Sequence, residues 1–193
     1  MKTIKLHKQE HDVKIGKDCP YYEPNIKEDC LLEVDGEIIG FYINDVSKYN
    51  TKLSQLISIS NKEFKSNNVP KSLLERSDVF AKVYKEGLTR KEAKKQGTIQ
   101  MSTILGSVAP KAHMRRPYPT ISSVHREKKA NTFIKAMWGA SVEAEKIIKQ
   151  LTPEIYKTQL ELFKDVDKKW RFGNMFTSSI SNFNIAAAYH RDT

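Results

Sequence analysis

The chain of 193 residues has only two cysteines, Cys19 and Cys30, and eight glycines. The spacing of the two cysteines fits no common zinc motif, and a bridge between them would close just one small loop. Reduced thiols, as in a cytosolic protein, are therefore the interpretation we favour. The few glycines form no phosphate-binding loop, and no serine lies in the Gly-x-Ser-x-Gly setting of a hydrolase nucleophile.

Long apolar runs are also missing. No segment approaches the ~20 consecutive apolar residues that a membrane-spanning helix requires, and the charged N-terminus is not followed by the apolar stretch of a secretory signal. We therefore expect no membrane partner and a cytoplasmic location. Apolar residues still make up 39% of the chain, which is enough for the core of one domain.

Acidic residues are the scarcer charged class, with 23 Asp and Glu against 33 Lys and Arg, for a net charge of +10. The excess is larger in residues 101–193, which hold 15 basic and 8 acidic residues, than in residues 1–100, which hold 18 and 15. Such a balance favours a polyanionic partner, because neutralised phosphates release counterions.

The densest basic stretch lies between residues 111 and 129, where Glu127 is the only acidic residue. Its cations and its tyrosine suit contacts with phosphates and bases. A solvated cationic loop is the alternative. The candidate nucleic-acid-binding residues are Lys111, Arg115, Arg116, Tyr118, Arg126, Lys128 and Lys129.

Hydrophobic patterning predicts an α+β fold. The pair Asp35-Gly36 between two apolar segments predicts a β-hairpin over residues 31–43, and Thr89 with Glu92 has the form of a capping box. Helices are predicted from about residue 45 to just before Asn67, over 129–151, and from 152 to about 169. Strands are predicted over residues 98–106, 121–125 and 176–190.

The chain ends in His190-Arg191-Asp192, followed by Thr193. In an extended strand, His190 and Asp192 share a face, and an imidazole with a carboxylate makes up two of the three ligands of a non-haem Fe(II) triad. The same parity puts Asn182 and Asn184 beside them, where their amides would line a substrate or cofactor cleft. A solvated tail is the alternative, since this triplet is common by chance. His113 and His125 have the spacing of ordinary polar residues rather than of a metal pair.

Five segments carry a resemblance to a known family: Ser102–Ser107, His113–Pro119, Ser122–His125, Phe133–Trp138 and Phe176–Asp192. Residues 98–193 resemble the TET/JBP-like branch of the 2-oxoglutarate- and Fe(II)-dependent dioxygenases, particularly the bacteriophage forms, which would place the chain in a host cell's cytoplasm. The resemblance implies a double-stranded β-helix preceded by supporting helices and strands. It also implies Fe(II) held by His190 and Asp192, 2-oxoglutarate as co-substrate, and oxidation of the methyl group of a modified pyrimidine in DNA.

The sequence stops before two features of that family, the distal iron-binding His and the basic residue that pairs with 2-oxoglutarate. We therefore expect an incomplete β-helix that binds Fe(II) weakly, scarcely binds 2-oxoglutarate and is inactive alone, so no residue is assigned a catalytic role. A fragment, an interrupted gene, half of a split enzyme completed by a second chain, and a non-catalytic DNA-binding or protein-interaction module all stay open. We divide the chain into residues 1–97, an α+β region of unassigned role, and residues 98–193, the dioxygenase-like region.

Overall fold

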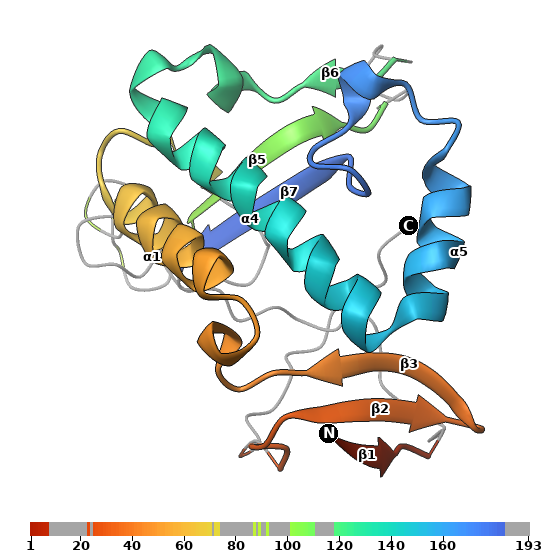
Figure 1. Cartoon of the computed structure of the whole chain (residues 1–193). Coiled ribbons are helices and arrows are strands. Elements are labelled where there is room, and N and C mark those ends of the chain that lie inside the picture. Colours follow the sequence, from red (N-terminus) through yellow and green to blue (C-terminus); the bar gives the residue numbers. More distant parts are fainter. Residues whose placement is uncertain are drawn as a thin grey trace.

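The computed structural model describes residues 1–7, 23, 25–70, 72–73, 87, 89, 92, 101–110 and 118–183. Within these residues the chain is mixed α+β, with three α-helices and two small sheets, neither of which is closed (Figure 1). The predicted α+β class is thus confirmed, whereas the two sheets of these described residues do not show the predicted double-stranded β-helix. None of the described helices is long and apolar enough to cross a membrane.

The first sheet contains β1 (Lys2–Lys5), β2 (Cys30–Val34) and β3 (Glu37–Tyr42) in that order. β1 runs parallel to β2, and β2 is antiparallel to β3. Asp35 and Gly36, with φ angles of 53° and 86°, connect β2 to β3. Both angles lie in the left-handed region that a two-residue hairpin turn requires, so the predicted hairpin is confirmed.

The second sheet is built around β5 (Met101–Val108). Along one edge, β7 (Ser178–Phe183) pairs with β5 in antiparallel register from Met101 to Gly106. The other edge carries two short strands, β4 (Ser72–Leu73) at the start of β5 and β6 (Thr120–Ile121) at its end. No strand among the described residues pairs with the middle of this second edge, which we call the open edge.

Two helices cover one face of this sheet. α4 (Asn131–Leu151) crosses β5 and β7, and α1 (Thr51–Lys65) packs beside it (Figure 1). The rings of Phe64 on α1 and Phe133 on α4 stack with centroids 5.7 Å apart. Leu105 of β5, which is fully buried, belongs to the same hydrophobic cluster. One core therefore joins residues from both predicted regions of the chain.

A buried carboxylate joins α4 to the start of α1. Glu143 is 3% exposed and accepts hydrogen bonds from Asn50 Nδ2 at 2.9 Å and from Lys146 Nζ at 3.0 Å. Lys52 Nζ lies 3.0 Å away as an ion-pair partner. The hydrogen bonds from Lys146, Asn50 and Lys52 lower the pKa of Glu143 to about 2. Because Asn50 also caps α1 by accepting from Leu53 N–H at 2.9 Å, Glu143 fixes the relative placement of the two helices.

α5 (Pro153–Phe163) follows α4 and is shorter than predicted. The interpretation of a helix reaching residue 169 is wrong, because Arg171 folds back and bonds the carbonyls at the helix end. Its Nε donates to Val166 O at 2.8 Å, and its Nη2 donates to Lys164 O at 3.2 Å. A separate 3₁₀ turn, η5 (Lys168–Trp170), then begins after Asp167.

Candidate functional site

The predicted site residues divide into two groups. Tyr118, Arg126, Lys128, Lys129 and Asn182 are among the described residues. The others lie outside the described residues: the predicted iron ligands His190 and Asp192, the amide Asn184, and the cations Lys111, Arg115 and Arg116. The iron site and three of the seven predicted nucleic-acid-binding residues therefore stay predictions from the sequence.

The segment after β6 departs from the sequence prediction. A strand over residues 121–125 is wrong, because pairing ends at Ile121 and Ser123–Arg126 forms the 3₁₀ turn η3. Ser122 N–H donates to Gly106 O at 2.9 Å, and Ser122 Oγ donates to Ile104 O. These long-range bonds attach Ser122 to the open edge of β5 and turn the chain away from an extended path.

His125 completes this attachment as a hydrogen-bond acceptor. Gly106 N–H donates to His125 Nε2 at 2.8 Å, so that nitrogen carries no proton and its lone pair is occupied. Burial lowers the pKa of His125, which favours the neutral imidazole that this bond requires. The ring also meets Phe172 edge-on, with centroids 6.5 Å apart. His125 is thus a structural acceptor that fixes the position of the next residue, Arg126.

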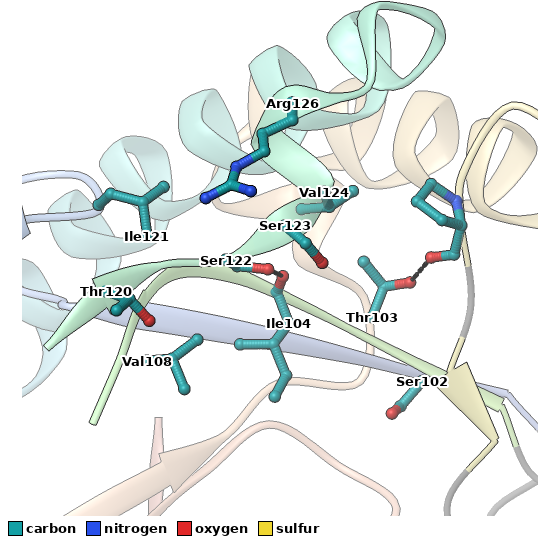
Figure 2. A pocket seen from close by; sticks show the side chains of 11 residues that line it. Ser102, Thr103, Ile104, Val108, Thr120, Ile121, Ser122, Ser123, Val124 and Arg126 are labelled. Atoms are coloured by element: carbon teal, nitrogen blue, oxygen red, sulfur yellow. Dashed lines mark hydrogen bonds between the residues drawn. The ribbon is translucent and has the colours of Figure 1, made fainter. Parts of the chain in front are cut away.

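Among the described residues, Pro70 lies where the pairing of β4 with β5 stops. The register Ser72↔Ser102, continued by two residues, brings Pro70 opposite Ile104. Proline has no N–H to donate to the ladder, so pairing with β4 cannot extend past this point. Side chains bond the edge instead: Thr103 Oγ1 donates to Pro70 O, as Ser122 Oγ does to Ile104 O (Figure 2).

A cavity of 520 Å³ lies along the open edge, and we call it the edge hollow. Its volume is within the ~300–1,000 Å³ range of small-ligand sites. Ser102, which lines it, is 3% exposed, and its hydroxyl makes no hydrogen bond with a described residue. The lining consists of Pro70, Ser102–Ile104, Val108, Thr120–Val124 and Arg126 (Figure 2).

Arg126, Lys128 and Lys129 form what we call the cationic rim. All three side chains are exposed on two consecutive 3₁₀ turns, η3 and η4 (Lys128–Ala130). The buried Val124 and Ala130, 2% and 0% exposed, fix the two turns to the core. Among the described residues, no carboxylate forms an ion pair with any of the three cations. The rim is therefore a positive surface held in place by apolar anchors.

The rim surrounds a second cavity, of 540 Å³, which it lines together with Asn67, Asn68, Pro70 and Glu127. Arg126 and Pro70 line both cavities, so the two are adjacent. Figure 2 shows the Arg126 side chain extending from η3 toward Ile121, above the edge hollow. A ligand could thus contact the rim and the edge hollow at the same time.

The other two described candidates lie apart from the rim. Tyr118 is 59% exposed and precedes β6 by two residues. Asn182 is on β7, opposite Ser102, and lines a smaller cavity of 260 Å³ between α1, α4 and β7 instead of the edge hollow. The structure therefore brings Arg126, Lys128 and Lys129 together and leaves Asn182 outside their site.

Sequence reasoning missed Ser102, Ser122 and Ser123 as lining residues. Isolated serines in or beside a predicted strand carry no signal, since their shared cavity comes from segments far apart in the chain. Among the described residues, no group of three or more His, Cys, Asp or Glu is placed to hold a metal ion. No protein-family model, curated protein or solved structure matches the chain.

Proposed function

We propose that this chain binds DNA through the cationic rim. The observation that supports this best is the grouping of Arg126, Lys128 and Lys129, exposed and without carboxylate partners among the described residues, around one cavity. Phosphodiester oxygens are the complementary ligands, because Arg and Lys both donate to phosphate and DNA binding releases counterions. The net charge of +10 adds long-range attraction for the same partner.

The test is the salt dependence of binding to a fluorescein-labelled DNA duplex, measured by fluorescence anisotropy. The double variant Lys128→Ala/Lys129→Ala should weaken binding and reduce the slope of log K against log salt by about 0.9 for each phosphate that the variant no longer neutralises. The matched control is Lys168→Ala/Lys169→Ala, which removes two charges from another 3₁₀ turn, η5. We expect the control to leave the slope nearly unchanged.

Two results would contradict this proposal. Equal slope changes in the two double variants would mean that only net charge matters, and the rim would not be the site. Absence of salt-dependent binding by the unmodified chain, both to the duplex and to a single strand of the same length, would contradict DNA binding altogether. Circular dichroism on both variants checks that the fold is retained.

A second proposal extends this function to DNA-base oxidation. The described α+β region would be the first part of a double-stranded β-helix, and the longer protein would oxidise the methyl group of a modified pyrimidine with Fe(II) and 2-oxoglutarate. Support comes from β7, a strand that lies within the predicted segment 176–190 and on which Asn182 is exposed. If the strand alternation continued, His190 and Asp192 would share a face with Asn182 and supply two iron ligands.

The iron proposal is tested by titrating the chain with Fe(II) under anaerobic conditions and following heat release. We expect weak binding that His190→Ala removes and that His113→Ala does not. Binding unaffected by His190→Ala would overturn the ligand assignment.

A partner chain that supplies the remaining strands belongs to this second proposal. β7 is paired on one edge only within the described residues, and an unpaired edge favours addition of another strand. Sedimentation velocity should then show self-association that grows with concentration. A monodisperse monomer at high concentration would contradict an edge that requires a partner.

A further inference from the structure

We propose, building on the DNA binding proposed above, that the cationic rim and the edge hollow together hold single-stranded DNA. One phosphate would lie on Arg126, and the base attached to the neighbouring sugar would enter the edge hollow. Single-stranded DNA is thus the partner, and duplex DNA is the alternative that the experiment separates from it.

The shared position of Arg126 is the first support. Arg126 lines both the edge hollow of 520 Å³ and the rim cavity of 540 Å³. A phosphate bound to its guanidinium would therefore have the edge hollow on one side, whose other lining residues are uncharged, and on the other side the rim cavity, lined by Lys128, Lys129 and Glu127. A nucleotide has the same arrangement, with a charged phosphate next to an uncharged base.

The lining of the edge hollow supplies the second support. Ile104 and Ile121 are 40% and 43% exposed, and they offer apolar contact to the faces of a base. Ser102 contributes a buried hydroxyl without a partner among the described residues. An unsatisfied buried hydroxyl is unfavourable, so a ligand with hydrogen-bonding edge atoms is a suitable occupant.

The form of the rim favours a single strand. Its cations lie within residues 126–129, on two short turns, a span that would contact the phosphates of one strand. Bases in a duplex are paired and stacked, whereas those of a single strand can leave the stack more easily. Proteins that bind single strands combine a positive groove with surfaces that contact bases, and the cationic rim and the edge hollow would supply these two parts.

The test fills the edge hollow without changing any charge. Ile104→Phe adds bulk to a half-exposed position of the lining. The matched control is Ile180→Phe, because Ile180 is the register partner of Ile104 on β7, is 52% exposed and does not line the hollow. Ser123→Leu fills the hollow from an exposed position on η3, so a folding defect of Ile104→Phe would not end the test.

Affinity is measured by anisotropy for a labelled thymidine oligomer of about 12 nucleotides and for a duplex of the same length. The unmodified chain should prefer the single strand by roughly tenfold, a preference that Ile104→Phe and Ser123→Leu remove and Ile180→Phe retains. Equal affinity for both DNAs, with salt dependence intact, would overturn the single-strand proposal and leave the proposed DNA binding standing. Absence of binding to either DNA would overturn both.

Discussion

The two edges of β5 are bonded in different ways. Along one edge, β7 pairs with the strand continuously from Met101 to Gly106, beneath the cover of α4. Along the open edge, two short strands flank a stretch that is bonded by the side chains of Thr103, Ser122 and His125. A strand that is fixed along one edge by a regular ladder can thus leave its other edge free to line a cavity. Substitutions on each side can test this division between a stabilising side and the proposed binding side.

The largest expected difference is between the losses of stability caused by replacing Phe133 and Ile104 with alanine. Phe133 is fully buried in the core that covers β5, and Phe133→Ala should lower the free energy of unfolding by about 3–5 kcal/mol. Ile104 is 40% exposed beside the edge hollow, and Ile104→Ala should lower it by less than about 1 kcal/mol. Urea denaturation of both variants measures the difference. Similar losses would show that the open edge carries as much stability as the covered face.

Gly106 contacts segments on both edges of β5. Its replacement should cause the next largest loss in the free energy of unfolding. Its φ is +79°, and a Cβ there would lie 2.4 Å from Thr177 O. Gly106→Ala should therefore cost about 3 kcal/mol through backbone strain and overpacking. The control Gly40→Ala, where a Cβ meets nothing within 4 Å, should change stability little. A small cost for Gly106→Ala, measured in the same urea titration, would refute the close approach of β7.

The pH dependence of stability tests the contribution of Glu143 on the stabilising side. Its pKa is about 2 in the folded chain, against an ordinary value of 4.5, so its contribution is complete above pH 4.5 and is lost as the pH falls toward 2. Glu143→Gln should cost about 1–2 kcal/mol at pH 7, and the two proteins should converge near pH 2. The control is Glu161→Gln on α5, whose carboxylate is 70% exposed and should not matter measurably. A constant difference between pH 7 and pH 2 would contradict the buried ion-pair cluster.

The prediction for the open edge concerns His125, for which we expect the smallest change in stability. Burial lowers its pKa in the folded chain below 6.5, so the unfolded chain takes up a proton first and stability declines as the pH falls below about 6.5. This decline in the free energy of unfolding should stay below about 1 kcal/mol, because the imidazole is partly solvated. His125→Gln keeps an acceptor for Gly106 N–H and should remove this component, which thermal unfolding between pH 7.5 and 5 can resolve. An identical pH dependence in both proteins would refute the acceptor role of His125.

Features that depend on neighbouring residues could be predicted from the sequence. The β2–β3 hairpin follows from Asp35-Gly36, because only a few residue types tolerate two positive φ angles in succession. The Thr89–Glu92 capping box is present, with Glu92 accepting from Thr89 N–H at 2.9 Å. The helical periodicity over 129–151 predicted α4 nearly to its bounds.

Other features could not be predicted, since their partners are distant in the chain. The apolar stripe of α4 gives no reason to bury Glu143, whose burial depends on Asn50 and Lys52 of another helix. The same holds for Glu145, which is 8% exposed and accepts from Tyr156 OH at 3.1 Å and Asn174 Nδ2 at 2.7 Å. Periodicity assigns charged residues to the solvent unless their partners are known.

The sequence by itself determined the α+β class, the hairpin, the long helix and the basic character of residues 126–129, because each depends on local backbone preference or on composition. Only the tertiary structure decided that Thr103 bonds to Pro70 O, that Ser122 and His125 bond to β5, and that Arg126 lines a cavity. These arrangements depend on hydrogen bonds between segments that are brought together only when the core of α1, α4 and β5 forms. A candidate ligand site at the open edge is therefore a property of the folded chain and of no single segment.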